Sequence, residues 1–399
     1  MKSKKTIFFY LIWVVFFLYG IDNYVFERKF FFNELLSLVG IIFASYFFVF
    51  SKEKPKLSRT SLYIFRALGM LLLLCLVHLV VSLTRMTSLY FYLRNSVIFY
   101  SIFTFFVGFF AFPYLEKFLE KTRPILWAYF IFALVFPAQY LLERFMGAVF
   151  FPLLFKNYKW QSLIGIILLS AALSVRYESL TVIMVLVLAL FILFLPSYKW
   201  FKISFFTGLI CLLVGFCYFA PNLNKYKEAP YSVTGNIEAV AESHPLLNLD
   251  GNSTWRAVFW YRITVERFPE NIAGIGFGTP LLPYIKGLDT IPVSNDDEHD
   301  MHVTGAHNTY LTLAIRLGLV FLILISFVFH YIFRYFYRQK QLLKQKNQIF
   351  FFYSFFTVSA VGFFNLVLES PTGASLFWGF LGITTAIIQQ HESATTVST

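Results

Sequence analysis

The sequence predicts an all-α, polytopic membrane protein with about twelve transmembrane helices and one large polar loop. Apolar residues make up 58% of the 399 residues, charged residues only 14%, and the mean hydropathy is +0.67. A water-soluble domain of this length does not need so large an apolar fraction. The apolar residues also gather in runs, and a run of about 20 residues is long enough to cross a bilayer as a helix.

The apolar runs, taken in chain order, give the individual spans. A span needs roughly 17 to 25 residues, and a shorter run is accepted where neighbouring spans would cover it. The sixth and seventh runs are the shortest. We expect spans at residues 6–20, 31–50, 61–83, 96–114, 124–141, 146–155, 161–174, 178–195, 201–220, 309–333, 349–368 and 372–388.

The basic residues predict how these spans are oriented. The net charge of +12 could suggest a nucleic-acid partner, but the lysines and arginines are scattered through short connectors, so we expect no nucleic acid to bind. Lysine-rich connectors mark the cytoplasmic side of a membrane. If the N-terminus is cytoplasmic, the lysine-rich connectors fall on that side and both chain ends lie there: residues 51–59, 116–123, 156–159, 199–202 and 334–346.

Three regions follow from this topology. Residues 1–220 would hold transmembrane helices 1–9, and residues 309–399 would hold helices 10–12 and a cytoplasmic tail. Between them, residues 221–308 would form a loop with interfacial helices on the opposite side. The composition changes at the start of this loop, after Ala220-Pro221, where Asn, Glu, Pro and Gly appear and the apolar run stops.

We expect one short helix within this loop, capped by Asn252 or Ser253 and ended by Pro269. Arg256 and Trp260 fall on one of its faces, because residues four apart are neighbours on a helix. An aromatic stripe with arginines at its ends is typical of a helix that lies in the membrane interface. After it, residues 274–278 predict a flexible turn, because three of the five are glycine.

A cofactor or metal is not expected. Residues 296–302 contain acidic side chains and two histidines, which suit a divalent cation as ligands. The run lacks the spacing of a known metal loop, however, and acidic runs in exposed loops are usually solvated. Residues 274–278 do not follow a predicted strand, so a dinucleotide site is not indicated, and no glycine-rich phosphate loop precedes a lysine-threonine pair.

The connectors on the side opposite the cytoplasm hold an unusual share of arginine over lysine. Basic residues are disfavoured there, so each arginine needs a reason, and binding a phosphate-bearing lipid is one because guanidinium grips phosphate with two hydrogen bonds. The alternative for any one of them is a solvated or headgroup-touching side chain. These arginines are Arg85, Arg94, Arg144, Arg176, Arg256, Arg262 and Arg267.

Arg176 is the best candidate among them. Its connector is so short that the guanidinium would be held at the membrane surface between two spans. The alternative is an ion pair with Glu178 or a neighbouring helix, which contributes little when exposed. Arg94 directly precedes a span, so it could bind substrate or serve as a snorkelling anchor.

His307 is the candidate catalytic residue. It places a titratable imidazole where the polar loop meets an apolar helix that we expect to run without a break to Phe333. A histidine at a helix start can also be only a capping residue with one backbone hydrogen bond. Asn308 and Tyr310, together with the arginines on the same side, favour the catalytic interpretation, in which the imidazole accepts a proton from an attacking hydroxyl group.

Four places in the sequence resemble the O-antigen ligase and O-antigen polymerase family of bacterial envelope enzymes. The first is residues 174–176, and the second is Arg256 with Trp260 and the turn at residues 274–278. The others are residues 306–311 with Gly318-Leu319 beyond them, and residues 377–382 in the last predicted span. Their order and spacing, with the spans and the late loop, cover most of the chain.

The resemblance implies a GT-C-like glycosyltransferase of the bacterial inner membrane. Such an enzyme uses an undecaprenyl-diphosphate-linked glycan as donor, needs no metal and faces the periplasm. His307 would then be the base that activates the acceptor hydroxyl, and Arg176 and Arg256 would neutralise the diphosphate leaving group. Arg94, Trp260, Asn308 and Tyr310 would complete the substrate site.

The chain departs from the family pattern at two positions. Members commonly have an acidic residue where Arg316 stands and a second glycine where Phe321 stands. Arg316 follows His307 by nine residues, or roughly 13 Å along a helix, which would place it inside the bilayer. An arginine there must pair or face a wet cavity.

The sequence leaves the acceptor open. It could be lipid A-core, which makes the enzyme a ligase, another lipid-linked glycan, which makes it a polymerase, or a protein. The rival class is a lipid-linked oligosaccharide flippase or transporter, for which about twelve spans are also natural and for which Arg316 is the strongest argument. Transporters, however, tend to show repeated halves and polar sites near mid-bilayer, whereas here the polar residues gather at one surface.

Overall fold

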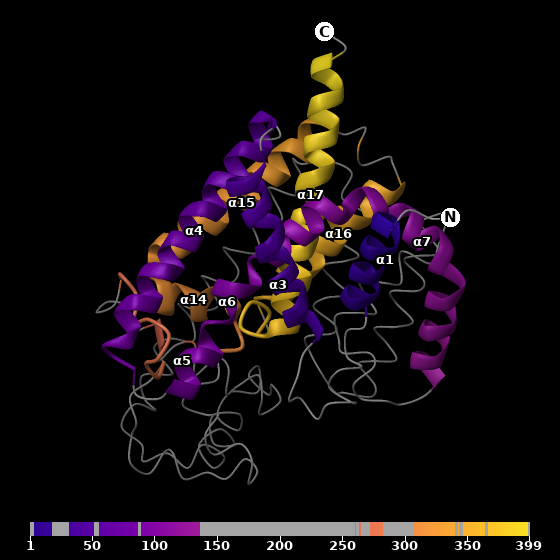
Figure 1. Cartoon of the computed structure of the whole chain (residues 1–399). Coiled ribbons are helices and arrows are strands. Elements are labelled where there is room, and N and C mark those ends of the chain that lie inside the picture. Colours follow the sequence, from indigo (N-terminus) through magenta and orange to yellow (C-terminus); the bar gives the residue numbers. More distant parts are fainter. Residues whose placement is uncertain are drawn as a thin grey trace, which may run out of the picture. The chain divides into compact units, whose positions relative to one another are not determined.

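In the computed structural model every regular element among the described residues is a helix, which confirms the all-α prediction (Figure 1). Four helices in this part of the chain are long and apolar enough to cross a membrane, at Arg59–Leu83, Val97–Thr122, Leu319–Arg338 and Pro371–Ala394. The described residues are 4–17, 32–51, 56–86, 89–135, 260, 263–264, 272–281, 306–339, 342, 346–363 and 366–397.

The chain divides into two compact units. The first comprises residues 1–75, 96–194 and 324–399, and the second comprises residues 76–95 and 195–323. Helices α4 (Arg59–Leu83) and α15 (Leu319–Arg338) contribute to both.

The first unit is a bundle of apolar helices. Beyond its parts of α4 and α15 it contains α1 (Lys4–Phe17), α3 (Phe32–Ser45) with the π-helical turn η1 (Tyr46–Phe50), α6 (Val97–Ser101), α7 (Thr104–Val135), α16 (Lys346–Val361) and α17 (Pro371–Val397).

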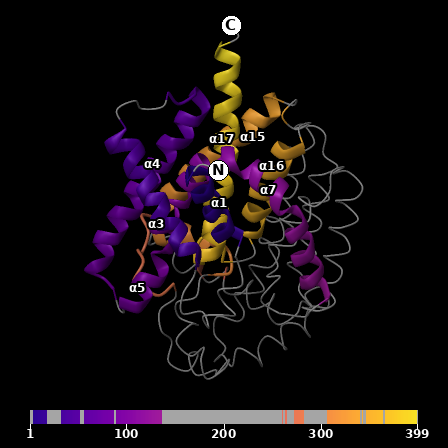
Figure 2. The ribbon, with the colours of Figure 1, turned by 45° about the vertical axis from the view of Figure 1, so that its right-hand side comes forward.

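Helix α17 is the centre of this bundle. It packs against α7, α16, α3 and α6, and Figures 1 and 2 show it in yellow beside α16 and α7. Glycines allow the close crossing with α7: a Cβ on Gly108 would lie 2.1 Å from the Gly379 carbonyl oxygen, and one on Gly382 would lie 2.1 Å from that of Phe105. Small residues serve the same purpose in many membrane bundles, because they let two backbones approach.

Helices α4 and α15 lie side by side in the first unit. The rings of Tyr63 and Tyr331 stack there with centroids 4.8 Å apart and an angle of 12° between their planes. Both helices keep many apolar side chains exposed, which is expected of helices that face lipid.

The second unit brings short elements together at the end of α4. These are α5 (Leu89–Asn95), the segment of residues 272–281 and α14 (Thr309–Leu317). The segment is not helical, and α14 is separated from α15 by Gly318 alone.

Several predicted spans correspond to helices, and two details differ from the prediction. The expected connector at residues 116–123 is helical, because α7 continues through it for 32 residues in spite of Pro113 and Pro124. At 1.5 Å per residue this helix is about 48 Å long, more than the roughly 30 Å of a bilayer core. The expectation of an unbroken helix after His307 is wrong, because α14 ends at Leu317 and α15 begins at Leu319. The predicted spans from residue 146 to residue 220 lie outside the described residues.

Candidate active site around His307

The described candidate residues all belong to the second unit. They are Arg94, Trp260, His307, Asn308 and Tyr310. Arg176 and Arg256 lie outside the described residues, so the expected diphosphate contacts of these two arginines stay predictions.

The start of α14 explains how His307 is placed. Asn308 is the N-cap, with extended backbone angles, and its side-chain oxygen accepts a hydrogen bond of 3.0 Å from the backbone N–H of Leu311. Asparagine is among the preferred residues at this position, because its oxygen satisfies an N–H group that the helix leaves unpaired. The capping role therefore belongs to Asn308, and His307 stands one residue before it.

His307 has an unusual backbone conformation. Its φ is +50°, and it is the single residue other than glycine with a positive φ among those that the structure describes. The left-handed region is sparsely populated by residues with a Cβ, and such strain tends to occur at functional sites. The side chain itself is half-buried.

Hydrogen bonds on both sides of Ala306 hold this conformation in place. The backbone N–H of Ala306 donates to the Thr312 hydroxyl at 2.8 Å, and that hydroxyl donates to the carbonyl oxygen of Asn308 at 3.0 Å. The indole Nε1 of Trp260 donates to the carbonyl oxygen of Ala306. Trp260, which we predicted as a substrate contact, thus fixes the backbone next to His307.

Trp260 also belongs to the apolar core beneath the site. This cluster of buried or partly buried side chains supports both the start of α14 and the segment 272–281. Its members are Trp260, Ile263, Ile275, Leu281, Ala306, Leu311 and Ile315. Tyr310, another predicted substrate contact, is itself buried.

Arg316 is completely buried and binds backbone carbonyls. Its Nη1 donates to the carbonyl oxygens of Gly276, Phe277 and Thr279 at 3.2, 3.2 and 3.1 Å. These carbonyls are the polar partners that we expected a buried arginine to need. All three carbonyls belong to the segment of residues 272–281.

The same segment pairs with the backbone of α14. The N–H groups of Ile275 and Gly276 donate to the carbonyl oxygens of Ile315 and Arg316, each at 2.9 Å. In return Leu319 donates its N–H to the Ile272 carbonyl oxygen at 3.0 Å. Our expectation that residues 274–278 form a flexible turn is therefore wrong, because the turn is bonded through side chains and backbone.

Two glycines make this close contact possible. Gly274 and Gly318 have φ values of +99° and +78°. A Cβ on Gly274 would lie 2.5 Å from the Arg316 carbonyl oxygen, and a Cβ on Gly318 would lie 2.5 Å from the Ile272 carbonyl oxygen. Only glycine satisfies both the backbone angle and the space.

The end of α5 is attached to the same segment. The Asn95 side chain donates to the Phe277 carbonyl oxygen at 2.9 Å, and the Ser82 hydroxyl accepts from the Phe277 N–H at 2.9 Å. Arg94, half-exposed, precedes Asn95 at this helix end. Our sequence reasoning missed Asn95 and Ser82; the signal for them was a polar residue at the edge of an apolar run.

The arrangement suits proton transfer by a held imidazole. His307 projects from a backbone that is bonded before and after it, while the positive charge of Arg316 is engaged by carbonyl oxygens. Among the described residues no three histidine, cysteine or acidic side chains gather as metal ligands do, and residues 296–302 lie outside this set.

Comparison with known proteins identifies the segment that contains the site. Residues 162–326 match the family model Wzy_C, described as O-antigen ligase. This range includes Arg176, Arg256 and His307, as well as the segment 272–281 and all of α14. No curated protein and no solved structure matches the chain.

Proposed function

We propose that this chain, a multi-pass membrane protein that matches the O-antigen ligase family through residues 162–326, transfers an undecaprenyl-diphosphate-linked glycan to an acceptor sugar. The family implies lipid-linked glycan substrates. The observation that carries the residue-level proposal is the positive φ of His307 inside the matched segment, next to Ala306, whose backbone N–H and carbonyl oxygen are both hydrogen-bonded.

In this reaction His307 is the general base. Its imidazole accepts the proton of the acceptor hydroxyl as the oxygen attacks the anomeric carbon, and the bond from that carbon to the lipid diphosphate breaks. The base and the leaving group stand on opposite faces of the carbon, so the product has inverted configuration. A fixed backbone supports this role because catalysis depends on holding the reacting groups within a narrow geometry.

The diphosphate leaving group needs positive charge. Arg176 and Arg256, with Arg94 at the end of α5, supply it in this proposal, since guanidinium groups in a poorly hydrated site stabilise developing charge without reorganisation. The transfer would then need no metal. The neutral contacts of the substrate site are Asn308, Tyr310 and Trp260 in our prediction, and the last also holds the Ala306 carbonyl.

The proposed topology has about twelve spans, both chain ends in the cytoplasm and the active site at the periplasmic face of the inner membrane. The donor tail would lie between spans and enter from the lipid. The acceptor is lipid A-core in a ligase or a second lipid-linked glycan in a polymerase, and a protein is the third alternative.

The flippase alternative has lost its main argument. It rested on an arginine within the membrane, and Arg316 is bonded to three backbone carbonyls. An arginine used in this way fixes a loop. A reconstituted protein that moved lipid-linked sugar without joining sugars would still favour the flippase.

Substitution of His307 tests the enzyme proposal. His307→Asn keeps a residue that tolerates the left-handed region but removes the base, so we expect transfer to fall by about a hundredfold or more. His330→Ala, an exposed histidine on α15, is the matched control and should leave transfer unchanged. Transfer is measured with purified protein, lipid-linked donor and acceptor, at equal amounts of folded enzyme. Near-normal transfer by His307→Asn would remove His307 from catalysis.

The envelope glycans of cells that carry the same variants distinguish the acceptors. Loss of mature ladders with accumulation of lipid-linked polymer indicates a ligase. Envelope glycans that end after a single repeat unit, in place of a ladder of longer chains, indicate a polymerase.

A further inference from the structure

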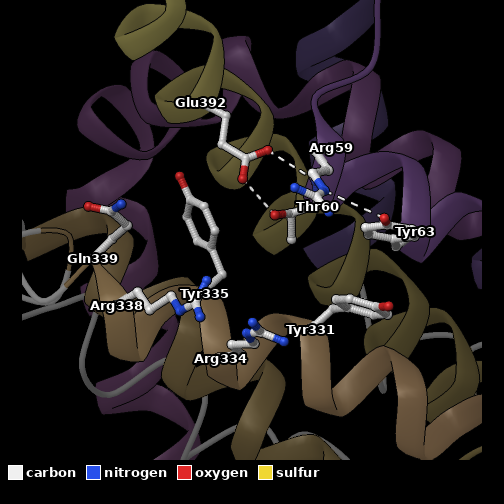
Figure 3. Close-up of a pocket in the computed structure, with 9 residues that line it drawn as sticks. All are labelled: Arg59, Thr60, Tyr63, Tyr331, Arg334, Tyr335, Arg338, Gln339 and Glu392. Atoms are coloured by element: carbon white, nitrogen blue, oxygen red, sulfur yellow. Dashed lines mark hydrogen bonds between the residues drawn. The ribbon is translucent and has the colours of Figure 1, made fainter.

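The ends of three helices in the first unit surround a pocket of about 340 Å³ (Figure 3). Its basic residues are Arg59 at the start of α4 and Arg334 and Arg338 at the end of α15. The other polar residues of the lining are Thr60 of α4, Glu392 of α17, Gln339 and the tyrosines Tyr63, Tyr331 and Tyr335. The volume lies in the range of small-ligand sites, which is about 300 to 1,000 Å³.

The pocket lies at a membrane surface. One candidate span begins at Arg59, a second ends at Arg338 and a third ends at Ala394, two residues beyond Glu392. The pocket is therefore placed where the apolar parts of three helices stop together. The lysine-rich connectors predict that this surface is the cytoplasmic one.

The walls of the pocket are held by contacts between the helices. Tyr63 and Tyr331 stack with their centroids 4.8 Å apart, which joins α4 to α15. The hydroxyl of Tyr335, a buried residue, forms a hydrogen bond of 2.7 Å with Nδ1 of His391, which joins α15 to α17. The arginines thus extend from a fixed frame.

The acidic residue of the pocket is engaged by the start of α4. Oε1 of Glu392 accepts from the Thr60 hydroxyl at 2.5 Å, and Oε2 accepts from the Thr60 backbone N–H at 3.2 Å. Arg334 and Arg338 form no ion pair or hydrogen bond with other residues in the part of the chain that the structure describes. Three guanidinium groups and one carboxylate leave the pocket with a positive charge of +2 by formal count.

We propose that this pocket binds a phosphate group, presented by an anionic lipid head group of the cytoplasmic leaflet. Arg334 and Arg338 are one helical turn apart on the same face, so both can reach one phosphate, and Arg59 faces it from α4. Basic pockets between transmembrane helices on the cytoplasmic side suit such head groups, and a free phosphate ester offers the same chemistry. The site uses none of the residues proposed for catalysis.

Native mass spectrometry of the full-length protein in non-ionic detergent tests this site. The probes are phosphatidylglycerol, phosphatidylcholine and inorganic phosphate. We expect phosphatidylglycerol to bind more tightly than phosphatidylcholine, and R334Q/R338Q to weaken it by about fivefold for each arginine, or about 25-fold for the pair. The matched control is K117Q/K121Q, which removes two exposed charges from α7, outside the pocket, and should leave the affinity unchanged.

The outcomes separate the two sources of phosphate. Phosphatidylglycerol binding that depends on Arg334 and Arg338 and resists inorganic phosphate supports a lipid head group. Competition by inorganic phosphate supports the free phosphate as the source. The proposal is overturned if wild type and R334Q/R338Q bind phosphatidylglycerol with equal affinity. It is also overturned if K117Q/K121Q loses as much affinity as R334Q/R338Q. Should R334Q/R338Q fail to fold, Arg59→Gln alters one exposed side chain and should weaken phosphatidylglycerol about fivefold, and no change there would also overturn it.

Discussion

Arg316 shows how a buried charge can organise a loop in this protein. Its side chain is fully buried, and one guanidinium nitrogen reaches three carbonyl oxygens of a segment about 40 residues earlier in the chain. A charge in such a place is costly unless hydrogen bonds compensate for lost water. The Gly276 carbonyl depends on the arginine in turn, because without it this oxygen of a buried residue would lose its partner, whereas the Phe277 carbonyl would keep the hydrogen bond from Asn95.

Removal of this guanidinium should therefore destabilise the second unit. We expect Arg316→Met to lower the free energy of unfolding by about 3 kcal/mol and to expose residues 272–281 to hydrogen exchange. The exposed Lys117→Met on α7 is the control and should change the stability by less than about 0.5 kcal/mol. Thermal unfolding and hydrogen exchange by mass spectrometry measure both effects. Unchanged protection of the segment in Arg316→Met would mean that the arginine does not hold it.

Substitutions of His307 should affect stability and activity separately. A positive φ costs about 1 to 3 kcal/mol of stability in a residue with a Cβ, and glycine avoids this cost. Glycine in turn loses roughly 0.5 to 1 kcal/mol more in chain entropy on folding, which offsets part of the gain. We expect His307→Gly to be more stable than His307→Ala by about 1 kcal/mol, although neither transfers glycan. Thermal unfolding of the two purified variants is the comparison. If the alanine variant is as stable as the glycine variant, the backbone at this position is not strained.

At the level of elements, the break between α14 and α15 is what lets the glycine-rich segment dock. Gly318 has φ +78° and ψ 179°, a region that is essentially restricted to glycine. Its conformation turns the N–H of Leu319 toward the carbonyl oxygen of Ile272. A continuous helix would close that N–H within its own hydrogen-bond ladder and leave the segment without this partner.

Gly318→Ala should accordingly be destabilising, by about 2 kcal/mol, because the Cβ would collide with the Ile272 carbonyl and the backbone angle is unfavourable. Gly69→Ala in α4 offers a matched control: no atom lies within 4 Å of its Cβ position, and alanine favours a helix, so stability should rise by about 0.5 kcal/mol or more. Denaturation of both variants in detergent gives the two values. Equal effects of the two substitutions would contradict the docking role of Gly318.

The sequence predicted the helices better than their ends. Apolar runs gave the spans that correspond to α4 and α17, because hydrophobicity and length are local properties. The break at Gly318 could not be predicted in this way, since an isolated glycine is tolerated in a helix and only the opposing segment makes it necessary. The length of α7 could not be predicted in this way either, because this helix continues through a charged connector and two prolines.

The candidate site was predicted in part for similar reasons. Residue type and position pointed to His307, and to Asn308 beside it, before any fold was available. The roles of Trp260 and Arg316 depend on contacts across 46 and 37 to 40 residues of sequence, and no local pattern contains them. Whether Arg176 and Arg256 approach His307 stays a prediction.

For the whole molecule, composition determines the class and the basic connectors determine the proposed orientation. The predicted cytoplasmic connectors hold most of the lysines, and membrane insertion recognises such a difference in positive charge between the two sides. The two functional proposals depend on this difference, because the diphosphate site must face the periplasm and the phosphate pocket the cytoplasm. Orientation can be measured independently of either activity.

Single cysteines at the two ends of α4 test that orientation. In a cysteine-free background, Lys56→Cys should react with a membrane-impermeant maleimide only after the inner membrane is opened, and Met86→Cys should react in cells whose outer membrane alone is permeable. Both positions are exposed and flank the span Arg59–Leu83, so differences in burial do not account for the contrast. The reverse pattern would mean that the orientation is opposite to the predicted one. The pocket of Arg334 and Arg338 would then lie at the periplasmic face, which would exclude a cytoplasmic head group as its ligand.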